Sequence, residues 1–264
     1  MKRNRTLSLL FHTAFMLFLL APLLIVIVVS FTDKGFISYP SDGLSLRWYQ
    51  AVLEEPRITQ SFWLSLKLAT FASTIAVCLA VPAALALTRF RFPGRDAVSA
   101  FLMSPLMIPN VVLGVSFLRF FNIAGLSGSV FWLTMTHVIF IFPYSLRLVL
   151  ASATGMDREV EMAARSLGAG KRHVYGRIIL PLILPGLTGG WLLSFIQSFD
   201  ELTMTVFVAT PGTTTLPVWM YNHIAQTIDP LITSVSAILI IATVIMMIIM
   251  DRLVGLDKVL IGKG

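Results

Sequence analysis

Residues 157–185 read DREVEMAARSLGAGKRHVYGRIILPLILP, a polar stretch that separates two strongly apolar ones. Four residues in its first half recur at helical spacing: Glu159, Ala163, Ala164 and Leu167. Gly168-Ala169-Gly170 then interrupts the helical pattern. We expect a second short helix from Lys171 to Leu180, closed by Pro181. From the pattern alone, this helix–turn–helix fits either a docking element for a soluble partner or a solvated loop.

The composition of the whole chain excludes most classes of protein. Of its 264 residues, 56% are hydrophobic and 12% charged, and the mean hydropathy is +0.85. Soluble domains carry about 25% charged residues, so a soluble enzyme is nearly ruled out, as are disordered chains, collagen and coiled coils. The single cysteine, Cys78, excludes a disulfide framework and a cysteine-based metal cluster.

Apolar stretches long enough to cross a membrane recur along the chain. A hydrocarbon core needs about 20 apolar residues per helix. Six stretches qualify: 7–31, 62–87, 97–118, 129–149, 186–207 and 231–250. The first is too long for a cleaved signal peptide and lacks its cleavage site. The chain is therefore predicted to be an all-α membrane protein, with residues 1–264 forming one domain of six transmembrane helices.

The basic residues set the orientation of these helices. Cytoplasmic segments carry an excess of Lys and Arg. With the N-terminus inside, only Lys34, Arg47 and Arg57 fall in outer segments. We therefore expect both termini in the cytoplasm, and read the net charge of +7 as a membrane-topology signal, not as nucleic-acid binding. The 151–185 insert then faces the cytoplasm, and Trp48 and Tyr49 suit an interfacial helix outside.

The insert resembles the cytoplasmic loop of permease subunits of ABC importers. That loop has the consensus E-A-A, three residues, G, nine residues, I-x-L-P. The matching residues here are Ala163, Ala164, Gly168, Ile178, Leu180 and Pro181. Met162 stands in place of the consensus Glu, and Glu161 lies one residue earlier. Arg89 to Arg95 (RFRFPGR) and Phe142-Pro143-Tyr144 resemble the same family.

The resemblance implies a type I ABC importer permease fold in a bacterial inner membrane. The implied partners are a second permease, expected to be a different chain, two ATP-binding cassette ATPase subunits and an extracytoplasmic solute-binding protein. It places ATPase coupling on Glu159, Glu161, Met162, Ala163, Ala164, Leu167 and Gly168. The Gly170-Lys171 pair is not a phosphate-binding loop, because Arg165 and Arg172 occupy the positions that require Gly and Ser or Thr. We therefore expect no cofactor and no enzyme activity in this chain, with ATP bound by partner subunits.

Two acidic residues, Asp200 and Glu201, are the only carboxylates deep in a predicted span. Such groups face a water-filled path or pair with a charge, and Lys67 and Arg119 are the candidate partners. Adjacent helix positions point about 100° apart, so we expect Asp200 to face the path. Residues 198–201, 215–218 and 220–221 resemble the polyamine branch of these permeases. The resemblance thus implies a pathway for a polyamine-like cation past Asp200, Glu201 and Tyr221.

Other interpretations stay open from the sequence. The solute could instead be an opine, an amino acid or an organophosphonate, and a different class is an ion-coupled secondary transporter that uses Asp200 as a cation site. Gly125-Leu126-Ser127-Gly128 resembles an intramembrane protease motif, but His137 and His223, the candidate partners, are better interpreted as interfacial. The four histidines are too scattered for a metal site. Gly186 and Gly190 serve either packing within the chain or a subunit contact.

Overall fold

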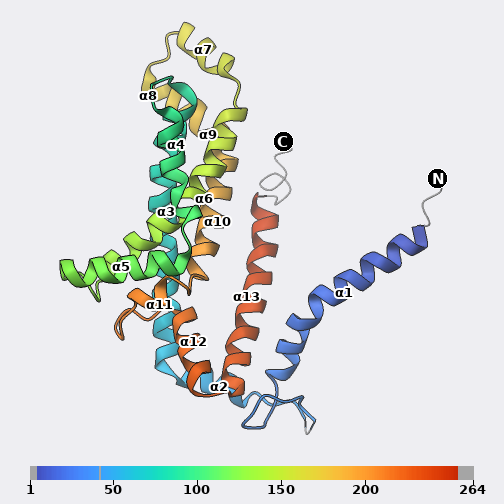
Figure 1. Ribbon diagram of the computed structural model, residues 1–264. Helices are drawn as coiled ribbons and strands as arrows, with labels where there is room; N and C mark the ends of the chain where they lie inside the picture. Colours follow the sequence, from blue (N-terminus) through green and yellow to red (C-terminus); the bar gives the residue numbers. More distant parts are fainter. Residues whose placement is uncertain (1–4, 42, 255–264) are drawn as a thin grey trace. The chain divides into compact units, whose positions relative to one another are not determined.

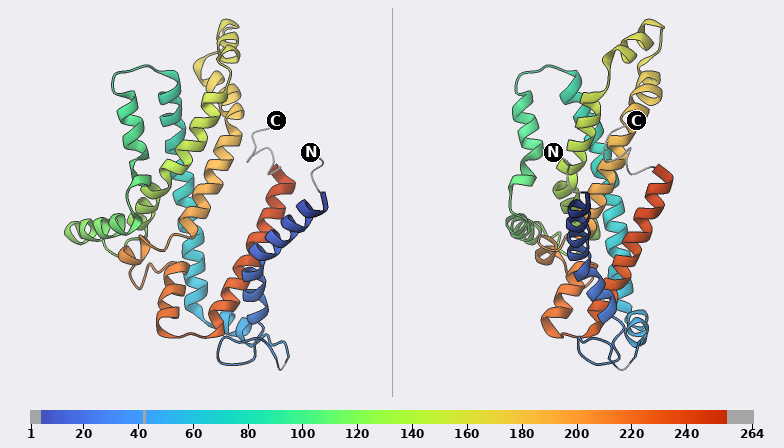
Figure 2. Two further views of the ribbon diagram at one scale, coloured as in Figure 1. Left: turned by 45° about the vertical axis from the view of Figure 1, so that its right-hand side comes forward. Right: turned by 90° about the vertical axis from the view of Figure 1, so that its right-hand side faces the viewer.

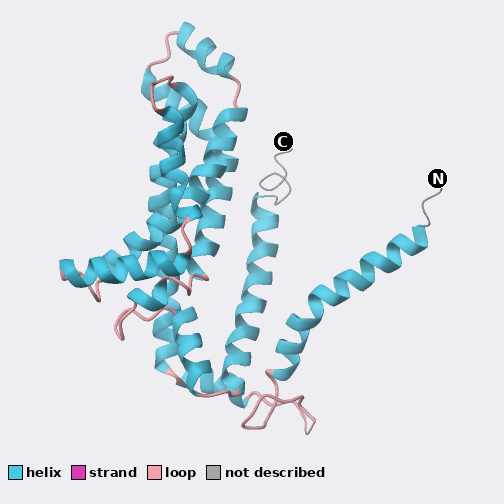
Figure 3. Ribbon diagram, in the orientation of Figure 1, coloured by secondary structure: helices cyan, strands magenta, loops and turns pink. Residues whose placement is uncertain are grey.

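A computed structural model describes residues 5–41 and 43–254, and no β-strand occurs among these residues (Figure 3). The prediction of an all-α protein is confirmed in this part of the chain. The helices fall into two compact units. One joins the N-terminal region up to Gln60 to Trp219–Arg252, and the other contains Ser61–Val218.

The first unit is organised around the end of α1 (Arg5–Val29). Just after this helix, the Ser30 hydroxyl lies 2.6 Å from the Tyr49 hydroxyl of α2 (Arg47–Glu54). The Ser234 hydroxyl of α13 (Pro230–Val254) donates to the Ser30 carbonyl at 3.3 Å. The short helix predicted around Trp48 and Tyr49 is therefore present, and these polar contacts hold α1, α2 and α13 together.

The second unit is a bundle in which α3 (Pro56–Arg89), α4 (Arg95–Met103), α6 (Val130–Gly155) and α10 (Leu184–Phe199) run side by side (Figures 1 and 2). Small residues bring α6 and α10 close together. A Cβ at Gly186 would collide with the Ser152 side chain and lie 2.7 Å from the Leu148 carbonyl oxygen. The Ser145 and Ser194 hydroxyls bond at 2.6 Å between the two helices. Gly186 and Gly190 therefore serve packing within the chain.

The predicted span 97–118 is wrong as one straight helix. After α4, a 3₁₀ turn (Ser104–Met107) ends at Ile108, and α5 (Asn110–Ala124) leaves at an angle of 96°. Pro109 has no N–H to continue the helical hydrogen bonds, and its ψ of 134° turns the chain away. Prolines inside an apolar span, here Pro105 and Pro109, predict a kink, but the observed 96° turn is much sharper than a kinked helix.

The number of membrane crossings remains a prediction. In the part of the chain that the structure describes, three helices are long and apolar enough to cross alone: α1 from Ser8, α3 and α6. Counting each of two bent helix pairs as one span gives up to five. The cytoplasmic location of the termini also remains a prediction, and four of the basic residues behind it, Lys2, Arg3, Lys258 and Lys263, lie outside the described residues.

The polar insert is shorter than predicted, because α6 continues to Gly155 and α10 starts at Leu184. It contains α7 (Arg158–Ser166), α8 (Lys171–Val174), a π-helical turn (Tyr175–Ile179) and α9 (Leu180–Leu182). The prediction that Pro181 closes the second helix is wrong, because Pro181 lies within α9. The π-helical turn shifts bonding to the i−5 carbonyl, with the Leu180 N–H bonded to the Tyr175 carbonyl. This wider turn accommodates a residue without an N–H, and the break falls at Ile183 instead.

Candidate functional sites

Helix α7 is defined at both ends by local hydrogen bonds. At its start, the Asp157 side chain accepts the Glu159 N–H at 2.8 Å. At its end, the Ala169 N–H bonds to the Ala164 carbonyl at 3.0 Å, and Gly168 has a left-handed φ of +85°. This is a Schellman motif, whose left-handed position favours glycine. The predicted glycine turn is therefore present at Gly168.

The two faces of α7 differ in burial. Ala164, together with Ala169 just after the helix, packs against a core cluster in the bundle that includes Val174 and Ile179. On the outer side, Met162 is 58% and Leu167 89% exposed. Glu159, Ala163 and Gly168 are exposed as well. Apolar side chains grouped on an exposed helix are typical of a protein contact surface. We name Met162, Ala163 and Leu167 the docking face, after the role predicted for them; all three are exposed.

Glu161 has a different environment from the rest of the predicted coupling residues. Its carboxylate lies 2.7 Å from Arg89 Nη1 at the end of α3 and 2.7 Å from Arg165 Nη2 on α7. The sequence analysis did not single out Arg89. The available signal was the place of Arg89 at the end of a predicted span that the predicted topology puts on the same side as the carboxylate-bearing insert.

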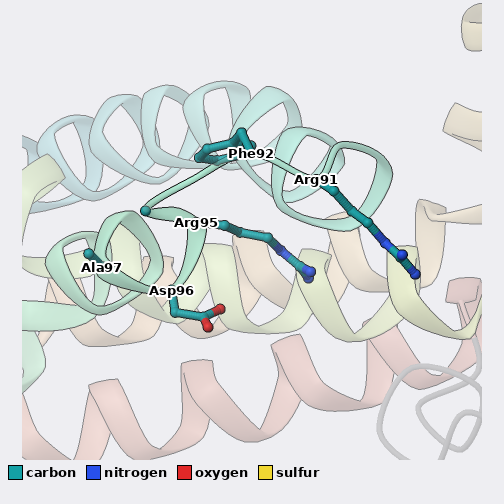
Figure 4. A pocket seen from close by; sticks show the side chains of 6 residues that line it. Arg91, Phe92, Arg95, Asp96 and Ala97 are labelled. Atoms are coloured by element: carbon teal, nitrogen blue, oxygen red, sulfur yellow. The ribbon is translucent and has the colours of Figure 1, made fainter.

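The turn that follows Arg89 borders a cavity of about 380 Å³, shown in Figure 4. Its lining residues are Arg91, Phe92, Gly94, Arg95, Asp96 and Ala97. No predicted pathway or coupling residue lines it. The Arg91 and Arg95 side chains extend in the same direction in Figure 4, so two cationic side chains and the one carboxylate of Asp96 line this cavity.

A second candidate site is the acidic bend of residues 200–205, between α10 and α11 (Thr205–Val208). The predicted span 186–207 is wrong here, because α10 ends at Phe199. Glu201 is buried, and its Oε1 accepts the Met204 N–H at 2.8 Å. Its Oε2 accepts the Thr205 N–H at 2.8 Å and the Thr205 hydroxyl at 2.6 Å. Glu201 therefore fixes the start of α11 and has its carboxylate fully used within the bend.

The bend is also tied to α6 through His137. The prediction that this histidine is interfacial is wrong, because it is fully buried. Its Nδ1 lies 2.9 Å from the Ser198 hydroxyl, and its Nε2 lies 3.0 Å from the Thr205 hydroxyl. Because the Thr205 hydroxyl gives its only proton to Glu201, His137 Nε2 must carry a hydrogen and donate. Nδ1 then accepts from Ser198. The sequence reasoning missed this network, and its one signal was a histidine inside an apolar span.

Asp200 lies at the surface of the same bend. It is the C-cap residue of α10 and is exposed; its N–H bonds to the Ile196 carbonyl at 3.0 Å, but its carboxylate has no hydrogen bond or ion pair among the described residues. Neither Lys67 nor Arg119 forms an ion pair with it there. Asp200 and Glu201 are not adjacent positions of one helix, as the separation of about 100° assumed, because α10 ends at Phe199. The third predicted pathway residue, Tyr221, is exposed on α12 (Leu216–Gln226) and belongs to the other unit.

The rejected protease motif has no catalytic geometry in the described residues. The Ser127 hydroxyl donates to Asn122 Oδ1 at 3.0 Å. His137 is occupied by Ser198 and Thr205 instead, and His223 Nε2 lies 3.1 Å from an Asp229 carboxylate oxygen. No histidine therefore activates this serine.

Comparisons with known proteins place this geometry in context. Residues 76–256 match the family described as the binding-protein-dependent transport system inner membrane component. The chain is 31% identical to the spermidine/putrescine transport system permease protein PotC of Escherichia coli K12, over 94% of this chain and 93% of that protein. It is 32% identical to the putrescine transport system permease protein PotI of the same strain, over 84% and 82%.

A solved structure shares the fold. It is that of a bacterial ABC transporter involved in the import of the acidic polysaccharide alginate, with a TM-score of 0.71 over 94% of this chain and 95% of that one. Sequence identity to it is 18%, so the likeness concerns the arrangement of the helices and not the solute.

Proposed function

Because the chain belongs to the family of binding-protein-dependent transport system inner membrane components, we propose that it moves polyamine-like or other small cationic organic solutes into the cytoplasm by alternating access, driven by ATP hydrolysis on separate subunits. The chain itself is a multi-pass inner-membrane permease subunit of a bacterial ABC importer and is not an enzyme. Membership of this family supports ATP-driven import over an ion-coupled secondary transporter.

The main structural support for a cationic solute is the exposed carboxylate of Asp200. A carboxylate next to the apolar part of a membrane protein is costly unless it faces water or a partner charge. Asp200 has no partner among the described residues, whereas its neighbour Glu201 is fully hydrogen-bonded. An ammonium group of a passing solute would supply the missing charge. The names of the relatives PotC and PotI, with spermidine and putrescine as their solutes, support the same class.

The docking face of α7 supports the ATP-driven step. Met162 and Leu167 expose apolar surface on a short helix whose backbone is fixed by its own capping bonds. An ATPase subunit that receives this helix in a cleft would bury that surface and move α7 when it closes on ATP. The full machine would contain two such ATPases, a second permease and an extracytoplasmic binding protein. Tyr221 would contribute an aromatic face to the pathway.

The test is uptake of labelled spermidine and putrescine by the complete complex in proteoliposomes. We expect uptake that requires ATP and the binding protein and that persists when ionophores collapse the ion gradients. Unlabelled polyamines should compete, whereas an opine, a neutral amino acid and an organophosphonate should not. Uptake of one of those three solutes in preference to polyamines would refute the cationic-solute assignment, and uptake without ATP would refute the coupling.

A further inference from the structure

A partly buried ion pair joins α7 to the end of α3. Arg89, the last residue of α3, places Nη1 2.7 Å from Glu161 Oε2, and the two side chains are only 10% and 12% exposed. Arg89 Nη2 also lies 3.8 Å from the Met156 sulfur, just before α7. The end of α3 therefore contacts the segment that leads into α7 and α7 itself.

Arg89 and Glu161 have few other partners that could compensate their charges. Arg89 Nε and Glu161 Oε2 are both buried without a hydrogen-bond partner in the described part of the chain. The 2.7 Å contact between Arg89 Nη1 and Glu161 Oε2 is therefore one of opposite charges, and the guanidinium depends on Glu161 for compensation. Glu161 has a second cation, Arg165, but that side chain is 49% exposed. Separating a buried pair leaves an uncompensated charge in a low-dielectric site, which is strongly unfavourable. Displacement of α7 therefore moves the end of α3 with it more readily than it breaks the pair.

The position of Glu161 in the sequence explains why this carboxylate points inward. Residues one apart on a helix point about 100° apart. Met162, at the consensus position, faces outward and is 58% exposed, whereas Glu161 faces α3. In this chain the Glu161 carboxylate, one residue before the consensus position, is therefore engaged within the subunit and is not free for the ATPase.

Helix α3 is suited to carry such a displacement. It extends over 34 residues from Pro56 to Arg89. Its Thr74 hydroxyl accepts the Trp191 indole N–H of α10 at 3.0 Å, and its Ser65 hydroxyl accepts the Leu216 N–H at 2.8 Å. These bonds connect α3 to the helix that precedes the acidic bend and to the segment that follows it.

We propose that Arg89 and Glu161 are positioning residues for energy coupling, which make α3 follow the displacement of α7. This proposal rests on the proposed docking of an ATPase on α7. It assigns the pair a role in the transfer of motion, separate from the docking face itself, and it gives the basic end of α3 a function that the sequence pattern alone did not.

The experiment measures solute taken up per ATP hydrolysed by the complete complex in proteoliposomes. Arg89→Met keeps an unbranched apolar chain but removes the less exposed of the two cations that Glu161 contacts, which leaves only Arg165. We expect assembly and basal ATP hydrolysis to persist while the uptake per ATP falls about tenfold. Arg95→Met is the matched control, because Arg95 lies in the same basic turn without an ion pair in the described residues, and it should keep the wild-type ratio.

A charge reversal distinguishes transfer of motion from simple stabilisation of the fold. In an Arg165→Gln background, which removes the third charge, Arg89→Glu alone should uncouple the complex. Adding Glu161→Arg should restore the uptake per ATP to within about threefold of the background. An uncoupled double variant, or a fully coupled Arg89→Met, would overturn the proposal. Leu167→Asp tests the docking separately. If Leu167→Asp has no effect on ATPase binding, the proposed function fails. If Leu167→Asp uncouples the complex and the Arg89 variants do not, only the Arg89–Glu161 role fails.

Discussion

Helix α7 and the acidic bend lie in the same unit but are held in opposite ways. Contacts within a few residues define α7: Asp157 caps its start and Gly168 turns the chain at its end. The bend depends on His137, which is more than sixty residues away in sequence and reaches both Ser198 and Thr205. The difference teaches that the shape of the docking helix is set by its own capping contacts, with the Arg89–Glu161 pair linking it to α3, whereas the bend keeps its shape only within the packed bundle.

Removing the buried carboxylate of the bend should have the largest effect on stability. Glu201→Leu leaves the Met204 and Thr205 N–H groups and the Thr205 hydroxyl without an acceptor, which we expect to destabilise the protein by about 4 kcal/mol. Chemical denaturation of the purified chain in detergent measures this change. Asp200→Leu is the control, with an expected change within about 0.5 kcal/mol because Asp200 is exposed and unbonded. Equal effects of the two variants would show that the bend does not depend on Glu201.

A change at the glycine turn should act on α7 alone. Gly168→Val forces a branched residue into a left-handed backbone, at a cost of about 1–2 kcal/mol. We expect faster hydrogen exchange in residues 158–169 and a loss of transport-coupled hydrolysis, with the bundle unchanged. Gly170→Val provides the control, since Gly170 has an extended backbone and open space around its Cα. If both variants transport at the wild-type rate, α7 does not dock through this turn.

Removing the N-cap should have the smallest effect. Asp157→Ala eliminates the bond to the Glu159 N–H, which is worth about 1 kcal/mol at an exposed helix start. Hydrogen exchange should increase at residues 158–161 only. Asp96→Ala, in the first turn of α4 where no side chain caps the helix, should leave exchange in α4 nearly unchanged. Loosening that spreads into α6 or α10 would contradict the local character of α7.

The same contrast explains how far the sequence was informative. The glycine turn at Gly168 follows from the local pattern, and this prediction is confirmed. Of the two interpretations of Gly186, the structure supports packing within the chain. The end of α10 at Phe199 could not be predicted from periodicity, because the apolar stretch resumes beyond the two carboxylates, with Leu202, Met204 and residues 206–208. What ends it is a set of side chains, Glu201 and His137 among them, that only the packed bundle brings together.

Helix breaks at prolines were anticipated only in part. Pro109 and the preceding turn were expected to kink a span, but the 96° change of direction depends on how α5 packs against α11. Gly114 of α5 shows this, since a Cβ there would lie 2.9 Å from the Met204 carbonyl oxygen. The ion pair of Arg89 with Glu161 likewise required the three-dimensional placement of two distant segments.

The most direct test of the cationic pathway neutralises Asp200 and measures transport. Asp200→Asn preserves the shape of the side chain and removes its charge, so we expect spermidine uptake to fall roughly 30- to 1,000-fold, equivalent to about 2–4 kcal/mol. Assembly, basal ATP hydrolysis and binding-protein affinity should remain at wild-type levels. Uptake by Asp200→Asn at the wild-type rate in a fully assembled complex would contradict the account, because the exposed carboxylate would then have no part in moving the solute.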